Sequence, residues 1–143
     1  MGKLLPEKSL CESNQKIIVS KDKGSQRIHR AINPEQKYSV RQYKLDGDIF
    51  QNQKCCDFLV LNDTNKNAYL VELKGGNIDH AVPQLEAGEK LCRPMLAGYQ
   101  FFYRIVCSKV RTHDVQKNSF RKFKDKCGSK LDYNSSCLEE TLA

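Results

Sequence analysis

The sequence has no long apolar run, and this absence excludes a class of proteins. No stretch approaches the roughly 20 apolar residues that a membrane-crossing helix needs, and residues 1–10 lack the apolar core of a signal peptide. There is also no internal repeat, no low-complexity segment and no C-x2-C pair of the kind that forms a zinc knuckle. We therefore expect a cytoplasmic protein with no membrane partner.

The composition indicates one folded domain. The chain has 143 residues, of which 39% are hydrophobic and 29% charged, as in polar globular proteins. This length is sufficient for one domain with its own core and short for two. We divide the single domain 1–143 into a helical N-terminal extension (1–36), a core (37–107), a basic segment (108–130) and a loosely attached tail (131–143).

Positive charge is in excess. The chain has 24 Lys and Arg against 17 Asp and Glu, a formal net charge of +7. Such an excess favours a polyanionic partner, either nucleic acid or an anionic membrane surface. Charge alone does not choose between these two.

The seven cysteines do not form a recognisable framework. Their number is odd, and no export signal accompanies them. We interpret them as reduced thiols that serve mostly as small apolar residues. A thiol redox protein built on Cys55 and Cys56 ranks last among the functions considered, because adjacent cysteines form a disulfide only with strained geometry.

Apolar periodicity and turn residues predict the order of elements. Strand patterns occur at 37–43, 55–61, 68–74 and 101–106, and helical patterns at 25–32, 83–99 and 120–127. Pro94 predicts a kink or an end in the second helix, and Gly128 an end to the third. The order predicts an α/β fold with a central mixed sheet of about four strands flanked by helices.

A predicted hairpin around the loop 62–67 contains the most informative residues. Its register places Asp57 directly opposite Glu72, with Cβ atoms roughly 4.5–5.5 Å apart. Lys74 leaves the same face, because side chains alternate along a strand. The opposite face would be core, formed by Phe58, Val60, Val71 and Leu73.

Two carboxylates this close repel each other unless a cation or a proton lies between them. Hard oxygen ligands of this kind suit Mg²⁺ or Mn²⁺, and a nearby ammonium could orient or deprotonate an attacking water. The alternative is a salt-bridge patch of Glu72 and Lys74 on a solvated sheet face. A register slip of one residue would separate Asp57 from Glu72.

These residues resemble the core of the PD-(D/E)xK nuclease superfamily, which includes restriction endonucleases, RecB-type exonucleases and archaeal Holliday junction resolvases. The resemblance covers about residues 37–107 and is carried by residues 56–60 (CDFLV) and 70–75 (LVELKG). Cys56 stands where the family name has Pro. The resemblance implies a restriction-endonuclease-like core and a metal-dependent nuclease, either endo- or exonuclease, with DNA a likelier substrate than RNA.

The resemblance also implies roles for individual residues. The catalytic set is Asp57, Glu72, Lys74 and Gln84, and the metal ligands for Mg²⁺ or Mn²⁺ are Asp57, Glu72 and the backbone carbonyl of Leu73. Some branches add a Glu from an N-terminal helix, and both Glu12 and Glu35 are available for this role. His80 either contacts a phosphate near the metal or makes a local hydrogen bond at a helix start.

The basic segment offers a nucleic-acid-binding surface. Its candidate phosphate contacts are Arg111, Lys117, Arg121, Lys122 and Lys124. The alternative is a solvated helix face anchored to the core by Phe120 and Phe123. Both hold together if the two rings point inward and the cations outward.

Two functions from different classes follow. The first is a nuclease that cleaves phosphodiester bonds with a divalent metal. The second is an inactive module of the same fold that binds nucleic acid or a protein partner, as an accessory of a defence or anti-defence system. The sequence leaves open a homodimer or a partner chain that completes the enzyme.

Overall fold

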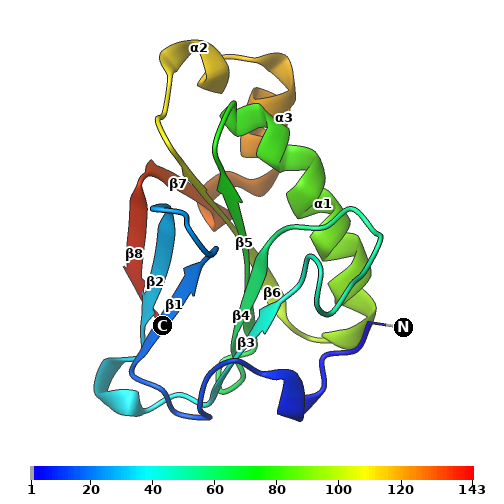
Figure 1. Cartoon of the computed structure of the whole chain (residues 1–143), viewed down its shortest axis with the longest axis vertical. Coiled ribbons are helices and arrows are strands. Elements are labelled where there is room, and N and C mark those ends of the chain that lie inside the picture. The colour runs from blue at the N-terminus through cyan, green and yellow to red at the C-terminus, as the bar shows by residue number, and fades with distance from the viewer. Residues whose placement is uncertain (1) are drawn as a thin grey trace.

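A five-stranded mixed sheet forms the centre of the computed structural model, which describes residues 2–143 (Figure 1). In spatial order its strands are β3 (Val40–Lys44), β4 (Phe58–Asn62), β5 (Asn67–Lys74), β6 (Gln100–Cys107) and β7 (Leu131–Ser135). β3, β4 and β5 are antiparallel, whereas β6 and β7 run parallel to β5. The expected α/β class with a mixed sheet is confirmed, with one strand more than the four expected.

A second, three-stranded sheet packs on one face of the first. It consists of β1 (Ile17–Lys21), β2 (Ile28–Ile32) and β8 (Cys137–Thr141), with β2 in the middle. β1 is antiparallel and β8 parallel to β2. The two sheets share two clusters of buried apolar side chains, one around Val60 and Tyr69 and one around Phe58 and Val71.

Helices cover the other face of the five-stranded sheet (Figure 1). They are α1 (Ala81–Cys92), α2 (Thr112–Val115) and α3 (Asn118–Cys127), with short 3-10 turns at Pro6–Lys8, Pro34–Gln36, Ile78–His80, Arg93–Met95 and Gly128–Lys130. The second helix, for which Pro94 predicted a kink or an end, ends at Cys92, and α3 ends at Cys127, directly before Gly128, whose φ of 58° suits glycine. Phe120 and Phe123 are buried, as predicted.

Two predictions at the ends of the chain are wrong. Residues 25–32, expected to be helical, contain β2, in which His29 and Ala31 are buried and their neighbours more exposed, the period of a strand. The N-terminal extension therefore contributes strands β1 and β2 rather than a helix. The tail expected at 131–143 forms β7, which pairs with the preceding strand β6, and β8, which pairs with the distant strand β2.

The alternation in β4 and β5 divides their side chains between the two layers. Leu59, Leu61 and Leu70 pack toward α1 in the largest core cluster. The face predicted to be core is also buried, since it lies beneath the three-stranded sheet. Both faces of the hairpin are therefore covered, which explains why its strands are almost continuously apolar.

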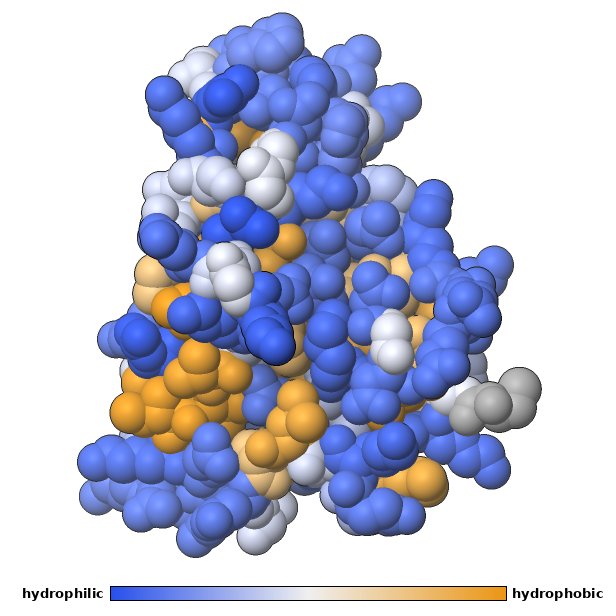
Figure 2. All heavy atoms as spheres, viewed as in Figure 1, coloured by the Kyte–Doolittle hydropathy of each residue, from blue (hydrophilic) through white to orange (hydrophobic). Residues whose placement is uncertain are grey.

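The face of the molecule that Figure 2 shows is mostly hydrophilic. An apolar patch lies over the three-stranded sheet in this view. The exposed large apolar side chains of residues 2–143 are Leu5, Leu10, Ile17 and Val19. All seven cysteines are free, and four of them are buried, as expected for thiols that fill apolar space.

Candidate functional site

The β4–β5 hairpin has the register that the loop length predicted. Leu61 pairs with Ala68 and Phe58 with Val71, so one further step along the ladder brings Asp57 opposite Glu72. Beyond Phe58 the main-chain ladder gives way to a side-chain contact, in which the Leu73 N–H donates to Asp57 Oδ2 at 2.8 Å. The hairpin thus opens at the point where the two acidic residues meet.

The two carboxyl groups are buried without a full set of partners. Asp57 is 9% and Glu72 6% exposed, and Glu72 Oε1 has no hydrogen-bond donor among the described residues. Burial, followed by the negative charge of Asp57, raises the pKa of Glu72 to about 9. Burial also raises the pKa of Asp57, although the hydrogen bond from Leu73 opposes this. Without a bound metal ion, the Asp57–Glu72 pair therefore retains a proton at neutral pH.

Lys74 and the main chain of Leu73 complete the end of β5. Lys74 is partly exposed on the same face as Glu72, and its charge lowers the pKa of that carboxyl, against the larger effect of burial. The N–H and C=O of one strand residue point toward the same neighbouring strand. Because its N–H points to Asp57, the Leu73 carbonyl also leaves β5 on the Asp57 side.

Two charged residues that the sequence analysis missed lie beside Asp57. Lys44, the last residue of β3, has its Nζ 3.6 Å from Asp57 Oδ1 and 3.8 Å from Asp22 Oδ1. Asp22 directly follows β1, in the loop that leads to β2. No local pattern marks either residue, because Lys44 reaches Asp57 through the pairing of β3 with β4, and Asp22 comes near only when the two sheets pack together.

The two glutamates considered as additional acidic ligands lie at the other end of the strands. Glu12 is next to Ser13, whose carbonyl accepts from the Val40 N–H at the start of β3. Glu35 follows the end of β2. Both side chains are exposed, and Asp57 lies at the opposite end of the β3–β4 pair. Neither is brought to the hairpin acids.

α1 places Gln84 on the side of the helix that faces the segment before Asp57. A Cβ added to Gly88 would lie 2.5 Å from Cys56 Sγ, so α1 packs directly on this segment. Gln84 is one turn earlier on the same helix face and is partly buried. His80 is exposed, and within residues 2–143 neither side chain makes a hydrogen bond to the hairpin acids.

The five basic residues of the C-terminal segment fall into two groups. Lys117 is held by carboxylates, with Nζ 3.7 Å from Asp79 Oδ1 and 3.9 Å from Asp114 Oδ1. The remaining four side chains are exposed around α2 and α3: Arg111, Arg121, Lys122 and Lys124. α2 packs against the 3-10 turn that follows β5, so these cations lie at the same end of the molecule as the hairpin acids.

The oxygen donors of the site suit a divalent cation, although the protein side chains do not supply a full coordination shell. In the part of the chain that the structure describes, no three His, Cys, Asp or Glu side chains converge as a metal-ligand set. Mg²⁺ often uses only one or two carboxylates and keeps several waters. Two opposed carboxylates, one with an unpartnered buried oxygen, and a main-chain carbonyl on the same side meet this requirement.

Comparisons with known proteins add no assignment. No protein-family model, curated protein or solved structure matches this chain. Within residues 2–143, no helix combines the length and apolar character needed to cross a bilayer.

Proposed function

We propose that this protein is a nuclease of the PD-(D/E)xK type that uses Mg²⁺ or Mn²⁺ to hydrolyse phosphodiester bonds, in DNA more readily than in RNA. The proposal depends most on one observation, the buried pair of Asp57 and Glu72 with an unpartnered oxygen at the open end of a hairpin. A structural carboxylate at such a depth is normally paired. An acid without a partner is typical of a site that receives a cation.

Each residue at the end of β5 has a distinct role in this proposal. Asp57, Glu72 and the Leu73 carbonyl hold the metal, which supplies positive charge to a phosphate oxygen and lowers the pKa of a water molecule. Lys74 orients the attacking water and neutralises charge that develops on the phosphate. Gln84 positions the site from α1, and the proposal assigns the core of β3 to β6 with α1 to the restriction-endonuclease-like class.

The exposed cations near the site bind the substrate backbone. Arg111, Arg121, Lys122 and Lys124 carry positive charge at the end of the molecule where the hairpin acids lie. Contacts of this kind are electrostatic and independent of base sequence. Lys117 contributes less, because two carboxylates already neutralise it.

A cleavage assay tests the proposal. Supercoiled plasmid, linear DNA and single-stranded RNA are incubated with the protein in Mg²⁺, Mn²⁺ or EDTA. We expect metal-dependent cleavage that Asp57→Asn and Glu72→Gln each reduce at least about a hundredfold. Glu86→Gln is the matched control, since Glu86 is an exposed acid on α1, and it should cleave as the unmodified protein does.

Two outcomes would contradict this function. Equal cleavage by Glu72→Gln and the unmodified protein would assign the activity to another site or to a contaminant. Retention of nucleic acid without cleavage of any substrate would favour the binding module of the same fold. In that case Glu72→Gln should leave the affinity unchanged.

A further inference from the structure

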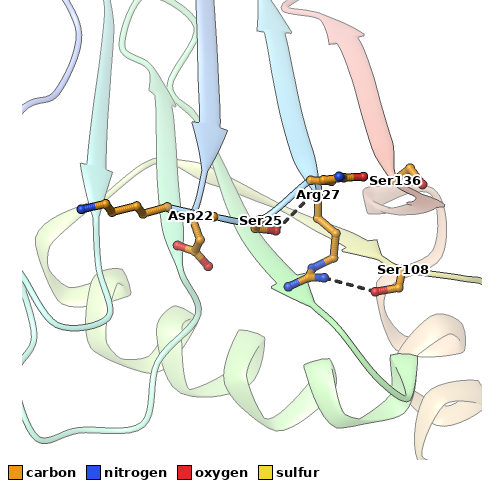
Figure 3. Close-up of a pocket in the computed structure, with 8 residues that line it drawn as sticks. Asp22, Ser25, Arg27, Ser108 and Ser136 are labelled. Atoms are coloured by element: carbon orange, nitrogen blue, oxygen red, sulfur yellow. Dashed lines mark hydrogen bonds between the residues drawn. The ribbon is translucent and has the colours of Figure 1, made fainter.

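A polar hollow of about 500 Å³ lies between the loop that joins β1 to β2 and the ends of β6 and β7. Loop residues 22–27 form one side of it, and Ser108 and Ser136 form the other (Figure 3). The volume is within the range of small-ligand sites. This hollow is separate from the three residues of the nuclease motif, none of which lines it.

The side chains around the hollow favour an anion. Lys23 and Arg27 supply cations, and Ser25, Ser108 and Ser136 supply hydroxyl groups. The one acidic side chain on this lining is Asp22, whose charge Lys44 offsets from 3.8 Å. Guanidinium, ammonium and hydroxyl donors around one space are the chemistry that binds phosphate.

Arg27 is positioned in the hollow but not neutralised. Its Nη1 donates to Ser108 Oγ at 3.1 Å, and Ser108 Oγ in turn donates to the Gly75 carbonyl at 3.1 Å. Figure 3 shows the Arg27 side chain extending from the start of β2 toward Ser108. The Arg27 Nε has no acceptor among the described residues. The guanidinium is therefore oriented by a neutral hydroxyl and keeps its positive charge available.

The hollow adjoins the hairpin acids through two connections. The Arg27 guanidinium lies 3.5 Å from the position of a Cβ on Gly75, the residue that follows Lys74. On the other side, Asp22 is linked to Asp57 through Lys44. At about 3.3 Å per strand residue, Gly75 lies roughly 10 Å from Glu72. One nucleic-acid backbone can reach both places.

We propose that this hollow binds a backbone phosphate of the nucleic-acid substrate, with Arg27 as its main ligand and Lys23 as a second cation. The proposal rests on the proposed function for the identity of the anion. It assigns substrate binding to the β1–β2 loop, in addition to the basic C-terminal segment. Ser108 acts as a positioning residue, because it orients the guanidinium.

Binding measured in EDTA tests the hollow without cleavage. The probes are a short fluorescent single-stranded DNA and its duplex, titrated at several salt concentrations. We expect Arg27→Gln to weaken binding about tenfold. The slope of the logarithm of the binding constant against the logarithm of the salt concentration should fall by about one, which corresponds to the loss of one phosphate contact. Lys16→Gln is the matched control at the other end of β1, where Lys16 is exposed, and it should change binding less than about twofold.

A second variant keeps the test decisive if Arg27→Gln fails to fold, which thermal unfolding would reveal. Lys23→Gln removes an exposed cation from the loop and should weaken binding by a smaller factor in the same direction. Unchanged affinity in the folded loop variants would overturn this proposal, even if the protein cleaves DNA. Weaker binding by these variants in a protein that never cleaves would support the hollow and contradict the nuclease function.

Discussion

Two largely buried glutamates in this protein have opposite electrostatic surroundings. On β8, Glu140 accepts from Arg104 Nε at 2.8 Å and Nη2 at 3.0 Å, and its Oε2 lies 2.6 Å from His29 Nε2. Burial alone would raise its pKa, but the bonds from His29 and Arg104 outweigh burial and lower it to about 2. On β5, Glu72 has an oxygen without a donor and a pKa of about 9.

The difference separates a structural acid from a candidate functional one. Glu140 joins β8 to β2 and β6, so it stabilises the contact between the two sheets. Glu72 makes no comparable bond, so the burial of its carboxyl group without a donor is unfavourable for stability. Proteins keep such a residue where function requires it. The two glutamates should therefore respond in opposite ways when each is replaced.

The largest effect should come from Glu72→Gln. Between pH 4.5 and about 9 the folded protein holds a proton on Glu72 that the unfolded chain has released, so its stability falls as pH rises through this window. Glutamine removes this dependence. We expect cleavage to fall at least about a hundredfold, while the melting temperature at the alkaline end of the window rises by roughly 3 °C. Parallel loss of activity and stability would assign Glu72 a structural role.

Glu140→Ala should have the opposite effect on stability and destabilise the protein. It leaves Arg104, which is 8% exposed, and the fully buried His29 without their shared acceptor. We expect a loss of about 3 kcal/mol in the free energy of unfolding, measured with urea. Its neighbour Glu139 pairs with Arg30 at the surface, and Glu139→Ala should cost less than about 1 kcal/mol. Equal losses in the two variants would contradict the structural role of Glu140.

The stability of the protein at acid pH also distinguishes Glu140 from Glu72. The pKa of Glu140 is lowered in the folded state, so its contribution is present above 4.5 and is lost as pH falls toward about 2. In the Glu140→Gln variant the melting temperature should fall less steeply across this acid range. An unchanged slope would assign the acid sensitivity to other carboxyl groups.

The smallest expected effect concerns Lys44, whose ammonium lies near Asp57 and Asp22. Lys44→Gln removes a positive charge from the site without removing a proposed metal ligand. We expect Mn²⁺ to bind a few-fold more tightly, as is typical of a partly exposed charge pair of up to about 1 kcal/mol. Calorimetric titration measures this, and weaker binding would mean that Lys44 positions the acids.

The parts of the fold that the sequence predicted correctly depend on contacts close in the chain. The loop 62–67 determined the register of β4 and β5, and Pro94 and Gly128 marked the ends of α1 and α3. The missed strand β2 lies in the middle of its sheet, with β8 more than 100 residues later in the sequence. Such a distant partner leaves little trace in a local pattern.

The sequence alone determined the register of the β4–β5 hairpin and that Glu72 and Lys74 share one face of β5, because a strand alternates its side chains and a short loop constrains the pairing. Only the tertiary structure brought Asp22 and Lys44 to Asp57 and Arg27 to Gly75. Lys44 reaches Asp57 across the β3–β4 pair of one sheet, whereas the contacts of Asp22 and Arg27 arise where the three-stranded sheet packs on the five-stranded one. Their distances depend on how two separate layers dock, which no local spacing of residues encodes.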